Sequence, residues 1–91
     1  MTDGIENEVG NSRFVLHLGG DEAELTYRLD GNRIILDYVG VPHAWRNRGY
    51  AAQLTRAALD WAREKGLEAV PVCPYVIWHV QHHPEYHDLV R

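Results

Sequence analysis

The sequence predicts an α+β fold in which an antiparallel meander of three strands is followed by a helix, a fourth strand and a second helix. Apolar and polar residues alternate over residues 23–30, as they do in a strand with one face in water. Over residues 49–65 the apolar positions recur every three or four residues, which indicates an amphipathic helix. Residues 68–72 return to a short strand pattern, so the order is β-β-β-α-β-α. A strand–helix–strand connection of this kind predicts that its two strands are parallel.

The remaining segments of the chain fit the same order of strands and helices. Residues 14–18 form a first strand, and an Asp-Gly-Asn turn at 30–32 supplies the positive-φ residues of a tight hairpin before a third strand over 33–41. Residues 74–83 form the second helix, because proline suits a first helical turn and the residue before a proline avoids helical angles. The first helix should turn toward the core the side chains of Ala51, Leu54, Ala58, Trp61 and Ala62.

Length and composition predict one domain. The chain has 91 residues, of which 45% are hydrophobic, and this is enough for a single modest core. Residues 1–12 are rich in glycine, asparagine and acids and offer little to bury. We therefore expect a mobile tail over 1–12 and a single domain over 13–91.

Charge and composition also argue against several classes of partner. The formal net charge of −4 disfavours a nucleic-acid binder, which usually carries a basic face. No apolar run approaches the roughly 20 residues of a membrane span, and the first residues lack the pattern of a signal peptide. The single cysteine, Cys73, rules out an internal disulfide and fits a reducing compartment, so we expect a cytoplasmic protein.

The segment 41–52 carries the strongest chemical signal. It leaves an apolar strand, passes two arginines and a glycine, and enters a helix whose first amides are unpaired and attract anions. Gly49 has no Cβ, so a phosphate can approach the backbone closely. Arg46 and Arg48 can add charge-assisted hydrogen bonds. The loop predicts a binding site for a diphosphate. The alternative is an ordinary helix start with solvated arginines, which is compatible with the same six residues.

Arg46-x-x-Gly49-x-Ala51 resembles the Q/R-x-x-G-x-G/A motif with which the acetyl-CoA-dependent acetyltransferases of the GNAT superfamily hold coenzyme A. The likeness to their short, stand-alone branch runs from about residue 14 to 89 and includes Val41-Pro42, Leu54, Ala57-Ala58-Leu59, Pro71, Cys73-Pro74 and His83-Pro84-Glu85-Tyr86. It implies a GNAT-like fold and acetyl-CoA as co-substrate. The cofactor-binding residues that it implies are Val39, Val41, Arg46, Asn47, Arg48, Gly49, Tyr50 and Ala51.

The resemblance also implies how the cofactor arm lies. The sheet should splay beside the loop, with residues 39–41 on one side of the gap and 73–75 on the other, and backbone N–H groups of the first side would polarise the thioester carbonyl. One departure concerns the base, because Tyr38-Val39-Gly40 stands where the family commonly has His-Thr-Glu. A second is Asn47, where the family often has glycine, although asparagine tolerates unusual backbone angles.

Cys73 is the candidate catalytic residue. It directly precedes Pro74 and should lie at the N-terminus of the second helix, where a thiolate is favoured. It could accept the acetyl group covalently, or the amine could attack the thioester directly. An inert, buried cysteine fits the same position.

Other candidates have plainer explanations. His43 could be a base or a phosphate contact but equally a solvated loop residue, and for Tyr86 packing is favoured over an acid role. The histidines at 79, 82, 83 and 87 suggest a metal, yet Pro84 breaks the helix among them, so we predict no metal site.

Three functions remain open. The first is transfer of acetyl to an amine of a small molecule or a lysine side chain. The second is a coenzyme A or acyl-CoA binding module without turnover, and the third is an interaction domain whose loop arginines contact acidic groups. The acceptor pocket should be open or completed by a second copy, and exposed apolar surface near Trp78 could support such a homodimer.

Overall fold

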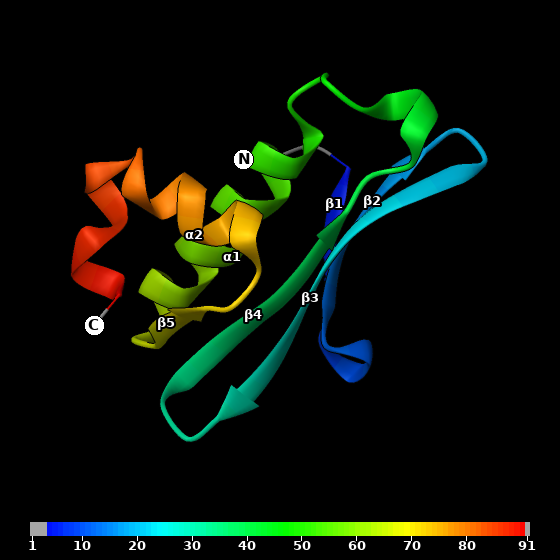
Figure 1. Ribbon diagram of the computed structural model, residues 1–91. Coiled ribbons are helices and arrows are strands. Elements are labelled where there is room, and N and C mark those ends of the chain that lie inside the picture. The colour runs from blue at the N-terminus through cyan, green and yellow to red at the C-terminus, as the bar shows by residue number, and fades with distance from the viewer. Residues whose placement is uncertain (1–3, 91) are drawn as a thin grey trace.

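Five strands form one sheet whose spatial order is the order in the chain. The computed structural model describes residues 4–90 (Figure 1). The strands β1 (Ile5–Glu8), β2 (Arg13–Leu18), β3 (Asp21–Asp30) and β4 (Arg33–Gly40) are antiparallel neighbours, and β5 (Glu68–Pro71) runs parallel to β4. The α+β class, the meander and the parallel crossover strand are therefore confirmed.

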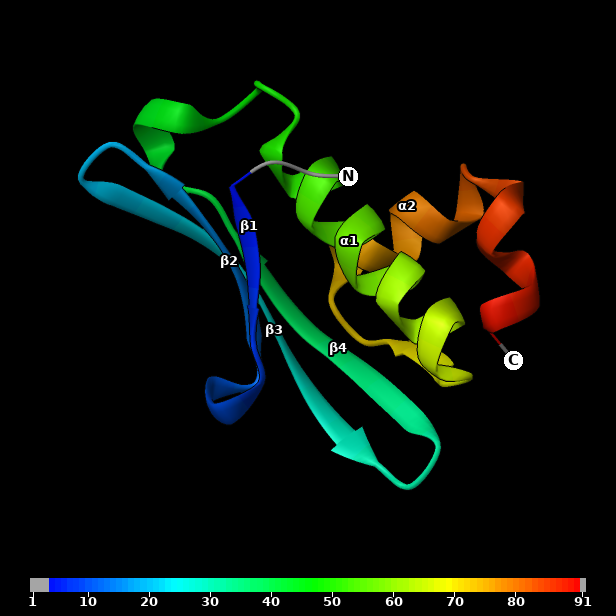
Figure 2. The same cartoon turned by 180° about the vertical axis from the view of Figure 1, so that it is seen from behind.

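Both helices lie on one side of this sheet. α1 (Tyr50–Lys65) connects β4 to β5, and α2 (Pro74–Gln81) follows β5 (Figures 1 and 2). Short 3-10 helices occupy Val9–Asn11, His43–Trp45 and Pro84–Leu89. No helix among residues 4–90 combines the length and the apolar character that crossing a membrane needs.

The N-terminal segment departs from the expectation. Residues 5–8 form β1, in which Ile5 pairs with Leu16. Asn7 accepts a hydrogen bond from the hydroxyl of Tyr27 at 2.7 Å. The prediction of a mobile tail over 1–12 is therefore wrong for residues 5–11, and its first three residues lie outside the described part. The reason is that the partners of β1 are distant in the sequence, so local composition does not reveal them.

The core lies between the sheet and α1. Three of the α1 positions predicted to face inward, Leu54, Ala58 and Ala62, have no exposed surface, whereas Ala51 and Trp61 are partly exposed. They pack against side chains from alternate positions of the strands, as the period of two requires. These strand residues are Phe14, Leu16, Ala23, Leu25, Tyr27, Ile34 and Leu36.

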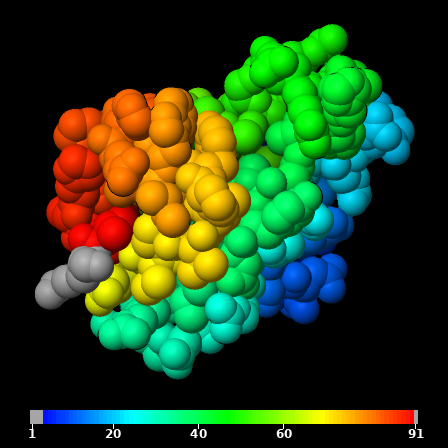
Figure 3. Space-filling view, viewed as in Figure 1, coloured from blue at the N-terminus to red at the C-terminus, as the bar shows by residue number. Residues whose placement is uncertain are grey.

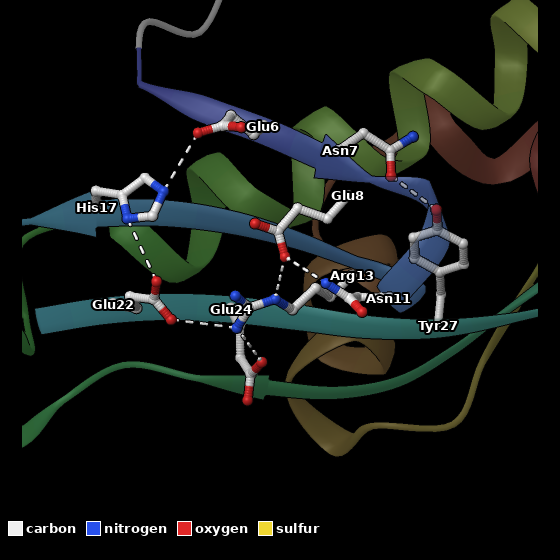
Figure 4. Close-up of polar contacts among 9 residues, drawn as sticks. All are labelled: Glu6, Asn7, Glu8, Asn11, Arg13, His17, Glu22, Glu24 and Tyr27. Carbon is white, nitrogen blue, oxygen red and sulfur yellow. Dashed lines mark hydrogen bonds and ion pairs between the residues drawn. The ribbon is translucent and has the colours of Figure 1, made fainter.

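The opposite face of the sheet is polar, and neither helix covers it. Arg13 bonds Glu8 at 2.6 Å and contacts Glu24 at 3.2 Å, while His17 lies between Glu6 and Glu22 (Figure 4). These contacts join β1, β2 and β3 across the strands. Because exposed pairs of this kind contribute little each, they specify register more than they stabilise the fold.

Candidate functional site

The site begins where β4 and β5 separate. Their pairing ends at Leu36, whose carbonyl accepts hydrogen bonds from the amides of both Val72 and Cys73, at 3.0 and 3.1 Å. Within the described part of the chain, β4 continues to Gly40 paired with β3 alone. A bulge at Asp37 increases the local twist at this point. The backbone groups of β4 that point away from β3 therefore border a gap in the sheet, as the resemblance implied.

A cavity of about 500 Å³ occupies this region. It is bounded by the end of β4, the loop before α1, the first turn of α1, and Tyr75 of α2. In Figure 3 the bright green loop and the yellow-orange start of α2 stand on either side of β4. Its volume is in the range of small-molecule and cofactor sites.

The structure brings most of the predicted cofactor residues to this cavity. Its lining includes Val39, Val41, Arg46, Asn47, Gly49, Tyr50 and Ala51. Arg48 is the exception, because its side chain points to the ring of Trp45 and does not line the cavity. Their contact with a cofactor stays a prediction.

Three lining residues, Tyr38, Trp45 and Ala52, were not among the residues predicted from the sequence to bind the cofactor or to border the gap. Trp45 directly precedes the motif and Ala52 directly follows it. The position of Trp45 next to the motif could therefore have indicated that it lines the same site. Tyr38 comes from β4 beyond the last contact of this strand with β5. The splay of the sheet brings it into the lining.

The backbone of the loop presents unpaired donors. Asn47 has φ 64° and Gly49 has φ 83°, so the chain turns twice through the left-handed region before α1 begins. Within residues 4–90 no oxygen atom accepts a hydrogen bond from the amides of residues 50–52; the first helical bond is that from Gln53 to the Gly49 carbonyl, at 3.1 Å. Free amides at a helix start carry partial positive charge, so this end attracts anions.

The two loop arginines are held differently. The Nε of Arg46 donates to the carbonyl of Val41 at 3.2 Å, which keeps this side chain at the cavity wall. The guanidinium of Arg48 lies 5.3 Å from the ring centre of Trp45. Neither arginine forms an ion pair with a carboxylate of the described chain.

Among the residues that line the cavity, Tyr75 has a side chain whose pKa is shifted by its surroundings. Burial raises the pKa of Tyr75 above its ordinary value of 10.0, partly opposed by the positive charge of Arg56. Its phenol is therefore protonated at neutral pH and can donate a hydrogen bond or a proton.

Cys73 lies at the N-cap of α2, as predicted, but it is buried. Its side chain does not line the cavity, although Tyr75, two residues further on, does. The position gives the thiol no recorded access to a bound thioester. A catalytic role for Cys73 stays a prediction.

Two further candidates lie away from the cavity. His43 is exposed in the 3-10 helix after β4 and does not line it. Tyr86 is packed in the core, and its hydroxyl donates to Asp60 at 3.1 Å. Burial and the negative charge of Asp60 raise the pKa of Tyr86 to about 12. Packing therefore accounts for Tyr86.

The histidine-rich segment has a structural explanation. Ring nitrogens of His82, His83 and His87 lie 2.7–2.9 Å from the carbonyl oxygens of Trp78, His79 and Val80. These carbonyls belong to the last turn of α2, and each also accepts a backbone N–H, from His82 or His83, so the imidazoles add a second donor to each. The histidines thus act as side-chain donors that cap α2.

Comparison with known proteins agrees with this geometry. The family model of the GCN5-related N-acetyl-transferase matches residues 13–89. The human protein NATD1 is 37% identical over 83 residues, which cover 88% of this chain and 74% of that protein, and the chicken NATD1 is 37% identical over 88% and 76%. The solution structure of a GCN5-like protein from Staphylococcus aureus superposes with a TM-score of 0.77 at 26% identity and covers 100% of this chain and 91% of the other. The chain therefore belongs to the GCN5-related N-acetyltransferase family.

Proposed function

We propose that this protein transfers the acetyl group of acetyl-CoA to an amine, on a small molecule or a lysine side chain. The row of unpaired amides at the start of α1, in the wall of the cavity, carries the proposal. A Cβ built on Gly49 would meet no atom within 4 Å, so open space lies in front of the backbone here. These features fit a diphosphate, which needs several donors and close approach to the main chain.

Different residues of the cavity would bind different parts of the cofactor. The amides of residues 50–52 and the guanidinium of Arg46 would hold the diphosphate. The pantetheine arm would follow β4 at residues 38–41, where unpaired backbone groups can bond its amides. The thioester would then lie toward the splay, between β4 and Tyr75.

The acetyl donor supplies an activated carbonyl. Groups of this chain can act on its oxygen atom and on the departing sulfur atom. When a neutral amine attacks this carbon, negative charge develops on the carbonyl oxygen, and N–H groups on the open side of β4 can stabilise it. The C–S bond then breaks, and the phenol of Tyr75 can donate its proton to the departing thiolate. The nitrogen must lose one proton after the attack, and this proton would restore the Tyr75 phenol, because no carboxylate or imidazole among residues 4–90 lines the cavity.

Binding is tested with a matched pair of glycine variants. Gly49→Ala and Gly31→Ala each place a Cβ at positive φ with no atom within 4 Å, so each should cost about 1 kcal/mol of stability. Coenzyme A at 100 times its Kd should raise the Tm of the wild type by roughly 10 °C, and adenosine should not. Only Gly49→Ala should lose affinity for coenzyme A, about tenfold, because its Cβ obstructs the phosphates. Equal losses in both variants, or no shift with the wild type, would contradict the proposal.

A binding module without turnover is the second candidate. It is favoured by the absence of a general base from the cavity lining within residues 4–90. The two functions are separated by following thiol release from acetyl-CoA in the presence of assorted amines. A catalyst should release thiol in proportion to amine, with Tyr75→Phe slowed about tenfold or more and Cys73→Ala unchanged if transfer is direct. Binding without amine-dependent release would favour the module.

A further inference from the structure

The two loop arginines point to two different places. Arg46 lines the cavity, whereas Arg48 lies over the ring of Trp45, outside the lining. Left-handed residues on both sides of Arg48, Asn47 and Gly49, turn the chain before and after it. The loop therefore presents one guanidinium to the cavity and a second one over the indole of Trp45.

Trp45 is itself held in place. Its indole N–H donates to the Asp21 carboxylate at 2.7 Å, which ties the loop to the start of β3. Its ring meets that of Tyr50 edge to face, with centroids 6.4 Å apart. Trp45 also lines the cavity, so this residue neighbours both the cavity and the Arg48 guanidinium.

Arg48 is available to an external anion. It is exposed, and no carboxylate of residues 4–90 forms an ion pair with it. The aromatic face restricts its conformations through a cation–π contact. A guanidinium held in advance loses less entropy when it binds, and its fork fits phosphate oxygens.

We propose that Arg48, positioned by Trp45 and Asp21, forms a second anion subsite that binds the 3′-phosphate on the ribose of coenzyme A. The inference rests on the proposed function and adds to it a specificity for the phosphorylated nucleotide. The diphosphate is served by the α1 amides and Arg46, so the ribose phosphate is the remaining anionic group of the same ligand. A phosphate monoester carries nearly two charges at neutral pH and forms strong bidentate bonds with arginine.

The experiment compares coenzyme A with dephospho-coenzyme A by titration calorimetry. The wild type should bind coenzyme A about tenfold more tightly. Arg48→Gln should lower that ratio to near one, by weakening coenzyme A alone, and Arg48→Lys should leave an intermediate ratio because it keeps charge without the fork. Arg33→Gln is the matched control, since Arg33 is also exposed and forms no ion pair within residues 4–90, but begins β4 at its other end. It should keep the wild-type ratio.

The same ratio of affinities, for coenzyme A over dephospho-coenzyme A, tests whether the indole of Trp45 positions Arg48. Trp45→Phe retains an aromatic face for Arg48 and should keep a preference of several-fold, whereas Trp45→Leu should lower it to that of Arg48→Gln. The Tm of each variant, measured without ligand, shows that it is folded. Quenching of tryptophan fluorescence by coenzyme A should decrease in Trp45→Phe.

The outcomes separate this inference from the function beneath it. If the wild type binds both ligands equally, or if Arg48→Gln weakens both equally, the subsite is wrong while the cofactor site stands. If the wild type binds neither ligand, both the subsite and the proposed function are wrong.

Discussion

His79 shows what a single residue contributes at the centre of this small fold. It lies on α2 with no exposed surface, and neither ring nitrogen has a hydrogen-bond partner within residues 4–90. Its ring stacks on that of His83 with centroids 3.9 Å apart, and Tyr75 and Tyr86 lie near it. Burial, with the neighbouring His83 and Arg56 adding to it and Glu85 opposing it, lowers the pKa of His79 from 6.5 to about 4. The ring is therefore neutral in the folded protein at neutral pH.

This burial predicts acid sensitivity. Between pH 6.5 and 4 the unfolded chain takes up a proton at His79 that the folded chain does not, so stability is retained above pH 6.5 and lost as the pH falls toward 4. The loss attributable to this residue at pH 5 should be about 1 to 2 kcal/mol. Urea unfolding at pH 7 and pH 5 measures it.

The control uses two phenylalanine variants. His79→Phe should lose less stability than the wild type between pH 7 and pH 5, because the buried group no longer titrates. His82→Phe replaces an exposed ring at the C-cap of α2 and should keep the wild-type difference. An unchanged pH dependence in His79→Phe would show that other groups govern acid stability.

At the scale of elements, β1 is the segment whose role differs most from its sequence character. It covers the edge of β2 and contributes Ile5 to the helix-facing side of the sheet. Its polar side chains find partners on other strands, since Glu8 bonds Arg13 and Asn7 accepts the hydroxyl of Tyr27. Burial raises the pKa of Tyr27 above 10.0, so the hydroxyl remains a donor at neutral pH. β1 is thus part of the folded domain.

Removing β1 should therefore destabilise the protein. A truncated chain beginning at Val9 loses the pairing with β2 and leaves the Tyr27 hydroxyl without its acceptor, so its Tm should fall by several degrees or more. A mobile tail would give the same Tm in both chains, as differential scanning calorimetry would show. Asn7→Ala should have a smaller effect of about 1 kcal/mol, and Tyr27→Phe in the same chain should restore part of it.

At the scale of the molecule, the fold separates the cavity from the polar face of the sheet. The cavity is assembled from β4, the loop, α1 and Tyr75, all at the end where β4 and β5 diverge. The β1–β2 side of the sheet carries ion pairs and takes no part in it. Ligand binding should therefore change amide protection mainly at one end of the sheet.

Hydrogen exchange measures this asymmetry. Coenzyme A should slow the fast-exchanging amides of residues 46–52 strongly, because the phosphates become their hydrogen-bond acceptors. Fast-exchanging amides of residues 5–18 should change little. Equal protection of both peptides would indicate that the ligand stabilises the whole sheet and that it does not bind at the loop.

Much of the fold could be predicted from residue order. The alternation in β3 and the helical period of α1 depend on neighbours within a few positions, and both elements were found where the pattern indicated. The loop motif is equally local, and most of its residues line the cavity, while their contact with a cofactor stays a prediction. β1 could not be predicted, because its stabilising contacts, to Arg13 and Tyr27, come from other strands. The same limit applies to Arg48, whose direction depends on Trp45 and, through it, on Asp21.

Local chemistry thus specified the order of elements from β2 to α2 and the unpaired amides at the start of α1, because propensity, periodicity and backbone freedom act over one or two turns of chain. The cavity, the distinct placements of Arg46 and Arg48, and the burial of Cys73 and His79 depend on strands and helices meeting across long stretches of sequence. Such contacts are set by packing of the complete fold, where the partner of each side chain is decided by distance in space.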